Sequence, residues 1–232
     1  MKIALLNPNS TASMTDKVRV VAEQYAAVGT EIIVANPSDT PVSIEGHYDE
    51  AMSLPGLLTE VQKADAAGAD GIVIACFDDP GLPACREISP APVVGLCESA
   101  MQFATVLATS FSVVTTLPRS VPIIEECARR YGMEHRCRKV RAANIPVLDL
   151  EHDAAAAVEK IKAEINRAIA EDRCEAVILG CAGMADLTRM LTKECGIPVI
   201  DGVVCALKLC EAIVGAGLKT SKINGYATPR KK

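Results

Sequence analysis

The sequence has almost no aromatic residues and very few histidines. It contains no Trp, and aromatic residues make up 3% of its 232 residues. Stacking platforms for nucleic-acid bases are therefore not expected, because aromatic side chains build them. With three His and no Cys-x-x-Cys spacing among ten Cys, the chain also has little with which to form a zinc site. A zinc site is therefore not expected, and nothing else in the sequence implies a metal or an organic cofactor.

Charge and hydropathy exclude further classes of protein. The net charge of −5 does not suggest the positively charged surface that binds nucleic acid, so no nucleic-acid partner is expected. The apolar stretch at residues 1–8 is too short for a signal peptide or a membrane span, so no membrane partner is expected either. Ten cysteines without a signal peptide predict reduced thiols in a cytoplasmic protein.

Strand-like and helix-like segments alternate along the whole chain. Short runs rich in Val and Ile predict strands at 2–7, 31–36, 71–76, 92–96, 111–116, 138–142, 175–180 and 197–200. Helices are predicted after Thr11 and at about 56–67, 80–88, 98–108, 119–131, 151–171, 184–194 and 202–215. Pro55 is expected to mark a boundary or an early helical position. This alternation predicts an α/β fold with mostly parallel sheets.

The chain also carries an internal repeat. Matching segments are Ile3–Asn7 with Phe111–Thr115 at an offset of 108 residues, Cys76 with Cys181 at 105, and Pro92–Gly95 with Pro198–Asp201 at 106. Buried parallel strands resemble one another, but three matches at nearly one spacing favour a duplicated half-protein. We therefore predict two pseudo-symmetric, doubly wound parallel-sheet halves with the active site in the cleft between them. The first half is expected at 1–97 plus 205–232 and the second at 98–204.

Cys76 and Cys181 occupy equivalent strand ends in the two predicted halves. Ligands bind beyond the carboxyl ends of strands in such sheets, so both thiols are expected to face the cleft. Two thiols straddling a carbon acid can take a proton from one face and return one to the other. A helix N-terminus can lower a cysteine pKa from its usual value of about 8.5, which would supply the thiolate. The other eight cysteines are expected to behave as small buried hydrophobes.

Four motifs resemble the hydantoin racemase and allantoin racemase family of the aspartate/glutamate racemase superfamily. They are Leu6-Asn-Pro-Asn-Ser-Thr-Ala-Ser-Met-Thr15, Pro41-Val-Ser-Ile-Glu-Gly-His-Tyr-Asp-Glu-Ala51, Cys76-Phe-Asp-Asp-Pro-Gly-Leu82 and Gly180-Cys-Ala-Gly-Met184. The resemblance implies a cofactor-independent racemase of 5-monosubstituted hydantoins with Cys76 and Cys181 as its two bases. It also implies that Asn9, Ser10, Phe77, Thr115, Thr116, Ala182, Gly183 and Met184 line the ligand site. Phe77, Ile44 and Met184 are candidate walls for the substituent at the substrate's C5.

Several alternatives stay open at this point. Allantoin is the close alternative substrate, since the C5 pocket decides between it and amino-acid-derived hydantoins. A non-enzymatic small-ligand binder is the alternative of another class, although it gives no reason for two matched thiols. A cis–trans isomerase of the same superfamily would need carboxylate-binding groups that are not evident. In amino-acid racemases of the superfamily, Asn-Thr follows the first cysteine and Thr-His follows the second. In this chain these positions are Phe77-Asp78 and Ala182-Gly183, which argues against a glutamate or aspartate racemase.

Two polar segments near the predicted site, at residues 45–48 and 78–79, are expected to have structural roles. Glu45, His47 and Tyr48 either close over the site, form a subunit contact or fix their own loop by hydrogen bonds, and the last is favoured. Asp78 and Asp79 are expected to cap the helix after Cys76. No interface signature is visible, but α/β enzymes of this type are commonly oligomers, so a homo-oligomer is expected.

Overall fold

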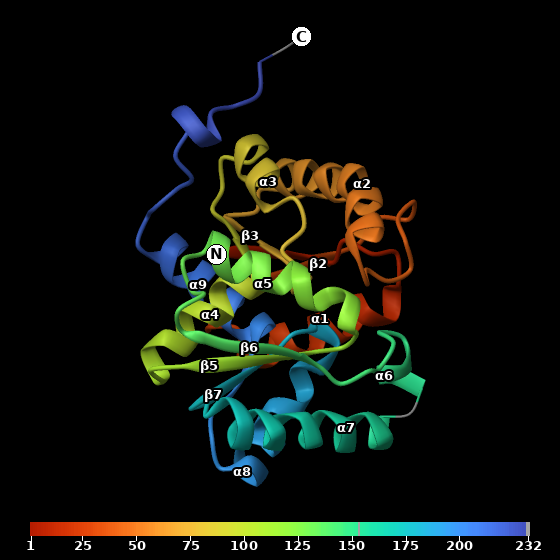
Figure 1. Cartoon of the computed structure of the whole chain (residues 1–232). Coiled ribbons are helices and arrows are strands. Elements are labelled where there is room, and N and C mark those ends of the chain that lie inside the picture. The colour runs from red at the N-terminus through yellow and green to blue at the C-terminus, as the bar shows by residue number, and fades with distance from the viewer. Residues whose placement is uncertain (153, 231–232) are drawn as a thin grey trace.

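Two four-stranded parallel sheets form the centre of the protein, which we describe from a computed structural model over residues 1–152 and 154–230 (Figure 1). The first sheet has the order β2-β1-β3-β4, with β1 (Lys2–Leu6), β2 (Glu31–Ala35), β3 (Gly71–Ile74) and β4 (Val93–Gly95). The second has the order β6-β5-β7-β8, with β5 (Phe111–Thr115), β6 (Cys137–Ala142), β7 (Ala176–Leu179) and β8 (Val199–Asp201). All pairings are parallel, which confirms the predicted α/β class.

The two sheets repeat each other down to single hydrogen bonds. Ala75, the residue after β3, donates its N–H to the carbonyl of Leu6 at 2.8 Å. Gly180, the residue after β7, donates its N–H to the carbonyl of Val114 at the same distance. Ile72 N–H likewise reaches the carbonyl of Pro92, as Val177 N–H reaches that of Pro198. The 105–108-residue spacing in the sequence therefore corresponds to one structural unit used twice.

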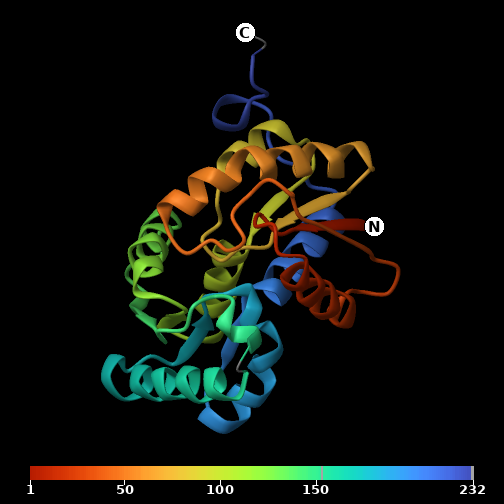
Figure 2. The same ribbon diagram turned by 90° about the vertical axis from the view of Figure 1, so that its right-hand side faces the viewer.

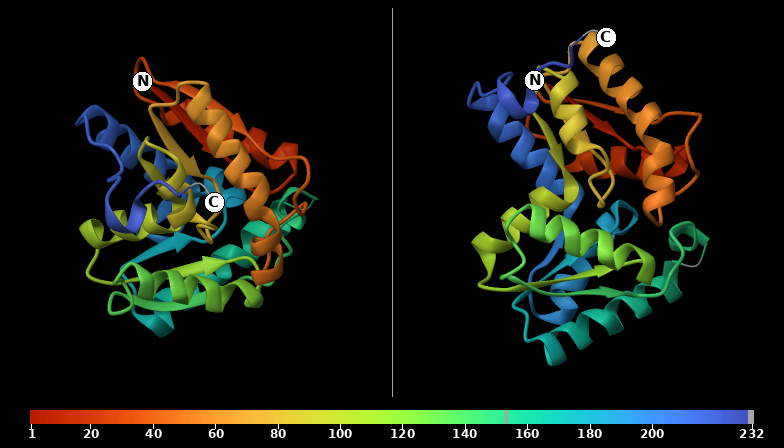
Figure 3. Two further views of the ribbon diagram at one scale, coloured as in Figure 1. Left: turned by 90° about the horizontal axis from the view of Figure 1, so that it is seen from above. Right: turned by 45° about the horizontal axis from the view of Figure 1, so that its top comes forward.

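Nine α-helices cover the sheets in the described residues. They are α1 (Ala12–Tyr25), α2 (His47–Ala66), α3 (Leu82–Ile88), α4 (Leu96–Leu107), α5 (Val121–Arg130), α6 (Asp149–His152), α7 (Ala154–Arg167), α8 (Thr188–Cys195) and α9 (Gly202–Gly215). Short 3₁₀ turns lie at Pro118–Ser120, Ala182–Leu187 and Asn224–Tyr226, and a π-helical turn lies at Ala168–Asp172. Each sheet and its helices form one of two lobes that meet along a common side (Figure 2 and the right-hand view of Figure 3).

The lobes share a hydrophobic core rather than a thin hinge. α4 packs against α9 between the sheets, α9 also packs on β3, and α4 also packs on β7. One buried cluster accordingly joins Leu5 and Val73 of the first sheet to Val113 and Ile178 of the second. Alternate residues such as Leu6 and Ile74 point to the opposite face and pack under α2 and α3.

Two expectations about the helices were wrong. Pro55 does not mark a helix boundary, because α2 begins nine residues earlier than predicted, at His47, and holds Pro55 in its interior. Gly46 precedes the helix in an extended conformation, and its carbonyl accepts the Glu50 N–H at 3.0 Å. The single helix predicted over 151–171 is replaced by α6, α7 and the following π-helical turn.

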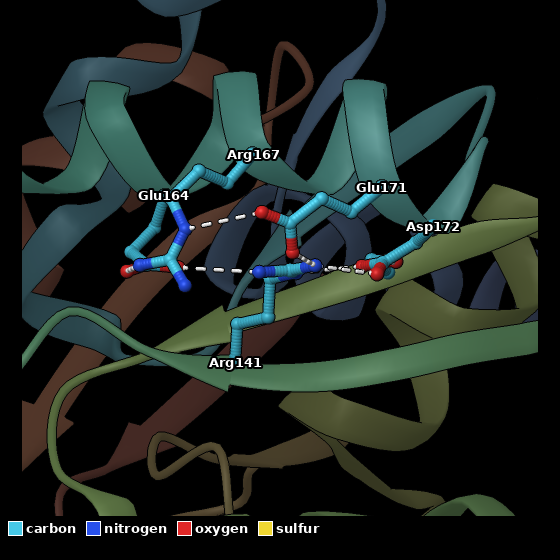
Figure 4. A network of polar contacts seen from close by, with 6 residues as sticks. Arg141, Glu164, Arg167, Glu171 and Asp172 are labelled. Carbon is cyan, nitrogen blue, oxygen red and sulfur yellow. Dashed lines mark hydrogen bonds and ion pairs between the residues drawn. The ribbon is translucent and has the colours of Figure 1, made fainter.

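The second lobe contains a buried arginine held by three acidic side chains (Figure 4). Arg141 on β6 has a side chain that is 3% exposed, and it donates to Asp172 through Nε at 2.7 Å and Nη2 at 2.5 Å. Its Nη2 also reaches Glu171 Oε2 at 2.8 Å. The network fastens β6 to the π-helical turn that follows α7.

In the part of the chain that the structure describes, no helix is both long enough and apolar enough to span a bilayer.

Candidate active site

Cys76 and Cys181 line the same small cavity, of about 30 Å³, from opposite sheets. Each follows the last residue of its strand by two positions, after β3 and after β7. The cavity is also lined by residues of both lobes, namely Asn9, Met14, Ile44, Ala75, Phe77, Asp78, Thr115, Thr116, Ser120, Val147, Gly180 and Ala182. The repeat thus brings two thiols from distant parts of the chain to one shared cavity.

The two sulfur atoms are held in the same way. The backbone N–H of Asp78 acts on the Cys76 thiol, and that of Gly183 on the Cys181 thiol, and each acts to lower the pKa of its sulfur. Each donor lies two residues after its cysteine. The next N–H along turns back to the cysteine's own carbonyl, from Asp79 to Cys76 at 3.2 Å and from Met184 to Cys181 at 3.1 Å. A tight turn after each strand therefore presents each sulfur to the cavity.

Burial raises the pKa of both thiols instead of the predicted lowering. Both are half-buried, with their remaining surface inside the cavity. Removal from water raises the pKa of Cys181 to about 11, and it raises that of Cys76 well above the usual range. The expectation of a helix dipole at Cys76 was wrong, because α3 begins six residues later, at Leu82. The backbone donors to the sulfurs oppose the rise but do not cancel it.

Asn9 enters the cavity wall from the loop after β1, supported by Asn7 behind it. The Asn7 side-chain amide donates to Asn9 Oδ1 at 2.9 Å and to Thr15 Oγ1 at 3.0 Å. Asn9 Oδ1 also accepts the Thr11 N–H at 2.9 Å. The Asn9 carboxamide is therefore fixed in one orientation at the cavity rather than free to turn.

Thr115 and Thr116 enter the cavity lining from the end of β5, in the second lobe. Both are buried. The Thr115 hydroxyl donates to the carbonyl of Gly180 at 3.1 Å and so ties the end of β5 to the residue before Cys181. A side chain on Gly180 would press against Thr115, with 2.9 Å between the two Cβ atoms. Thr115 consequently positions Cys181 as well as lining the cavity.

Glu45 closes one side of the cavity by joining the lobes. Its Oε1 accepts the Val147 N–H at 3.0 Å, and its carbonyl accepts the Ser120 hydroxyl at 3.4 Å. Ile44 and Val147, on either side of this contact, both line the cavity. His47 and Tyr48 begin α2 and do not line the cavity, and Tyr48 is exposed. Of the loop residues singled out in the sequence, Glu45 thus makes the fixing hydrogen bonds.

The structure places most, but not all, of the predicted site residues at the cavity. Asn9, Ile44, Phe77, Thr115, Thr116 and Ala182 line it with the two cysteines. Three others do not. Ser10 donates its N–H to the carbonyl of Pro41, Gly183 acts through its backbone on Cys181, and Met184 is buried in the core of the second lobe.

Sequence reasoning missed further lining residues, and it misjudged the adjacent Asp78 and Asp79. Missed residues are Met14, Ala75, Asp78, Ser120, Val147 and Gly180. Asp79 does cap a helix, but the helix is α4, whose Cys97 and Glu98 N–H groups it accepts at 3.1 and 2.9 Å. It also accepts the Tyr131 hydroxyl at 2.8 Å. Asp78 does not cap α3, the helix that follows Cys76, and instead lines the cavity. Its place two residues after Cys76 was the available signal.

Comparison with known proteins identifies the family. The model of the Asp/Glu/Hydantoin racemase family matches residues 3–210. The chain belongs to this family. It is 54% identical over 232 residues to the hydantoin racemase of Rhizobium meliloti, covering all of this chain and 96% of that protein. Its structure matches the allantoin racemases from Klebsiella pneumoniae, at 44% identity with a TM-score of 0.98, and Pseudomonas fluorescens, at 39% with 0.97. These matches cover all of this chain and 95% and 98% of those chains, respectively.

Membership of this racemase family has direct consequences for the alternatives. The chain is a racemase, and hence an isomerase, acting on a small molecule. The non-enzymatic binding protein considered above is therefore set aside. No cluster of three His, Cys, Asp or Glu side chains that could hold a metal ion occurs within the described residues.

Proposed function

We propose that this racemase interconverts the D and L forms of 5-monosubstituted hydantoins, without a cofactor, using Cys76 and Cys181 as its two bases. The observation that carries the proposal is the shared cavity, which the two thiols line from pseudo-equivalent strand ends. A carbon lying between them would be reached on opposite faces. One thiolate and one thiol are what the reaction requires.

The proton transfers follow from this arrangement. The thiolate on one side takes the proton from C5, which leaves a planar enolate delocalised onto the neighbouring ring carbonyl. The thiol on the other side then gives its proton to the opposite face of C5, and the product is the mirror-image substrate. The protonation states of the two cysteines are exchanged after each turnover, so the pair titrates as one unit.

The hydantoin ring fits the polar groups that surround the thiols. Asn9, Thr115 and Thr116 can pair with the ring's amide donors and acceptors, while Ile44 and Phe77 offer apolar walls. Ala182 also lines the cavity, whereas Ser10, Gly183 and Met184, which the family resemblance implied as well, lie outside its lining. Few charges are needed, because the hydantoin ring carries no net charge at neutral pH.

Allantoin is the second candidate substrate, and one observation favours it. Allantoin racemase structures match this fold with TM-scores of 0.97 and 0.98. The higher sequence identity, 54%, is to a hydantoin racemase. We therefore place 5-substituted hydantoins derived from amino acids first.

Loss of optical rotation from enantiopure 5-benzylhydantoin and from enantiopure allantoin, measured in parallel, tests the proposal. Both assays contain a metal chelator and a thiol reductant. Decay to zero with benzylhydantoin is the expected result. Faster decay with allantoin would assign the enzyme to allantoin instead, and no decay with either would refute the proposed substrate class.

Three further features belong to the proposal. We place the enzyme in the cytoplasm, in keeping with ten cysteines that are all unpaired. We expect a homo-oligomer, which light scattering coupled to size-exclusion chromatography would establish. We also assign 1–97 plus 205–232 and 98–204 as the two halves, which is supported by the packing of α9 on β3.

A further inference from the structure

Asp78 is a buried carboxyl group at the proposed substrate site that has no hydrogen-bond partner among the described residues. It lines the cavity with both cysteines and is 5% exposed. Throughout the described residues its carboxyl oxygens meet no hydrogen-bond donor or acceptor, whereas the neighbouring Asp79 carboxylate accepts three. Fully enclosed unpaired side-chain oxygens occur there only on Thr40 and Ser110, so the Asp78 oxygens keep surface toward the cavity.

The surroundings of Asp78 favour its neutral form. Burial and the negative charges of Glu50 and Asp79 raise the pKa of Asp78 to about 8. The titratable groups that face it are Glu50 on α2, Asp79 beside it, and the thiols of Cys76, Cys181, Cys97 and Cys127. All of these groups are acids, so a negative charge on Asp78 would be stabilised by none of them. Ionised Asp78 would also raise the pKa of both site thiols further.

A neutral carboxylic acid has a particular binding partner. It presents an O–H donor and a carbonyl acceptor side by side, which is the complement of an amide whose N–H and C=O lie on the same edge. Ring amides are held in this cis arrangement, whereas open-chain amides are almost always trans. An O–H donor is also what an enolate oxygen requires as negative charge develops on it.

We propose that Asp78, as the neutral acid, binds the cis-amide edge of the substrate ring, donating to the carbonyl next to C5 and accepting the ring N–H beside that carbonyl. This rests on the proposed function and deepens it, because it defines the substrate class as cyclic cis-amides and imides. Open-chain amino acids lack this edge. Asp78 holds the ring and stabilises the enolate, while the cysteines alone move the protons.

Variants of Asp78 separate this role from a structural one. Asp78→Ala removes both hydrogen bonds and is expected to lower kcat/KM for 5-benzylhydantoin by about 100- to 1000-fold, as for loss of an oxyanion donor. Asp78→Asn keeps one donor and one acceptor in the same shape but cannot ionise. It is expected to stay within about tenfold of the wild type at pH 7.

The pH profile supplies a readout that packing would not change. Because the pKa of Cys181 is raised to about 11, log kcat/KM should climb with pH as the thiolate forms. In the wild type the climb should level off near pH 8 as Asp78 ionises, while in Asp78→Asn it should continue to higher pH, until the imide N–H of the substrate itself ionises. The same levelling-off in Asp78→Asn would overturn the proposal, even if Asp78→Ala failed to fold.

Substrate methylation tests the contact directly. Methylating the ring nitrogen between the two carbonyls of 5-benzylhydantoin should cost the wild type at least tenfold in kcat/KM and cost Asp78→Ala less than twofold. An equal cost in both proteins would refute the contact. Wild-type enzyme that racemises neither benzylhydantoin nor allantoin would refute the proposed function itself. An active wild type with a fully active Asp78→Ala would refute only the role of Asp78.

Discussion

Replacing Arg141 by Ala should be among the most damaging single changes outside the cavity. The guanidinium is buried on β6 and is the shared partner of Asp172, Glu171 and Glu164 (Figure 4). Its removal leaves Asp172, whose side chain is 7% exposed, with the Ser112 hydroxyl at 2.9 Å as its remaining hydrogen-bond donor in the described chain. A buried charge that loses its partner is poorly solvated and unpaired.

The size of the loss follows from which acids stay paired. Breaking one partner of a buried ion pair costs about 3–5 kcal/mol. In the variant, Glu164 and Glu171 still form ion pairs with Arg167, at 2.6 and 3.6 Å. Most of the lost stability therefore comes from the unpaired carboxylate of Asp172. We therefore expect a loss near the lower limit, about 3 kcal/mol of unfolding free energy. For a chain of this length that corresponds to a melting temperature lower by about 6–12 °C.

Urea denaturation followed by circular dichroism measures this loss, with Arg138→Ala as the matched control. Arg138 lies on the same strand but is exposed, and its removal should change stability by less than about 0.5 kcal/mol. Similar losses in the two variants would refute the assignment of Arg141 as a buried anchor.

The pH dependence of the Arg141→Ala effect has a definite sign. Burial acts to raise the pKa of Asp172, but hydrogen bonds from Arg141 and Ser112 outweigh it and hold the pKa below its usual value. A carboxyl group whose pKa is lower in the folded than in the unfolded state stabilises the fold at pH values above its unfolded pKa. This stabilisation is lost as the pH falls through its folded pKa. The deficit of Arg141→Ala should thus be largest near neutral pH and shrink as the pH falls into the acid range, where the unpaired Asp172 of the variant takes up a proton.

Two further variants test contacts between the lobes. Tyr131→Phe deletes the 2.8 Å hydrogen bond to Asp79 and should cost about 1.5–3 kcal/mol in urea denaturation. Tyr226→Phe, which loses only a contact at 3.5 Å, serves as control, and equal losses would contradict the bridging role. Glu45→Ala removes the acceptor of the Val147 N–H and should raise KM several-fold in steady-state racemisation with kcat nearly unchanged. An unchanged KM would mean that Glu45 does not hold the cavity wall.

The sheets and the thiol pair could be predicted because their signals are local or repeated. The strands end within three residues of their predicted limits, since buried parallel strands are short apolar runs bounded by polar residues. Cys76 and Cys181 were recognised by their equal positions in a repeat, not by any property of cysteine. Both inferences need only spacing along the chain.

Other features depend on contacts that spacing does not reveal. Asp78 and Asp79 are neighbours of one type, yet Asp79 meets α4 and Tyr131 while Asp78 meets the cavity. Glu45 pairs with Val147, 102 residues away. The thiol pKa values were misjudged because burial, which is set by the whole fold, outweighs the local backbone donors.

Exchange of the C5 proton for deuterium in heavy water, with each single-cysteine variant and each enantiomer of 5-benzylhydantoin, tests the two-thiol account most directly. Cys76→Ser and Cys181→Ser should both lose racemisation, and each should still exchange the proton of one enantiomer, a different one in each variant. Cys195→Ser, outside the cavity lining, should behave as the wild type. Full racemisation by either cavity variant, or exchange of both enantiomers by one of them, would contradict the account.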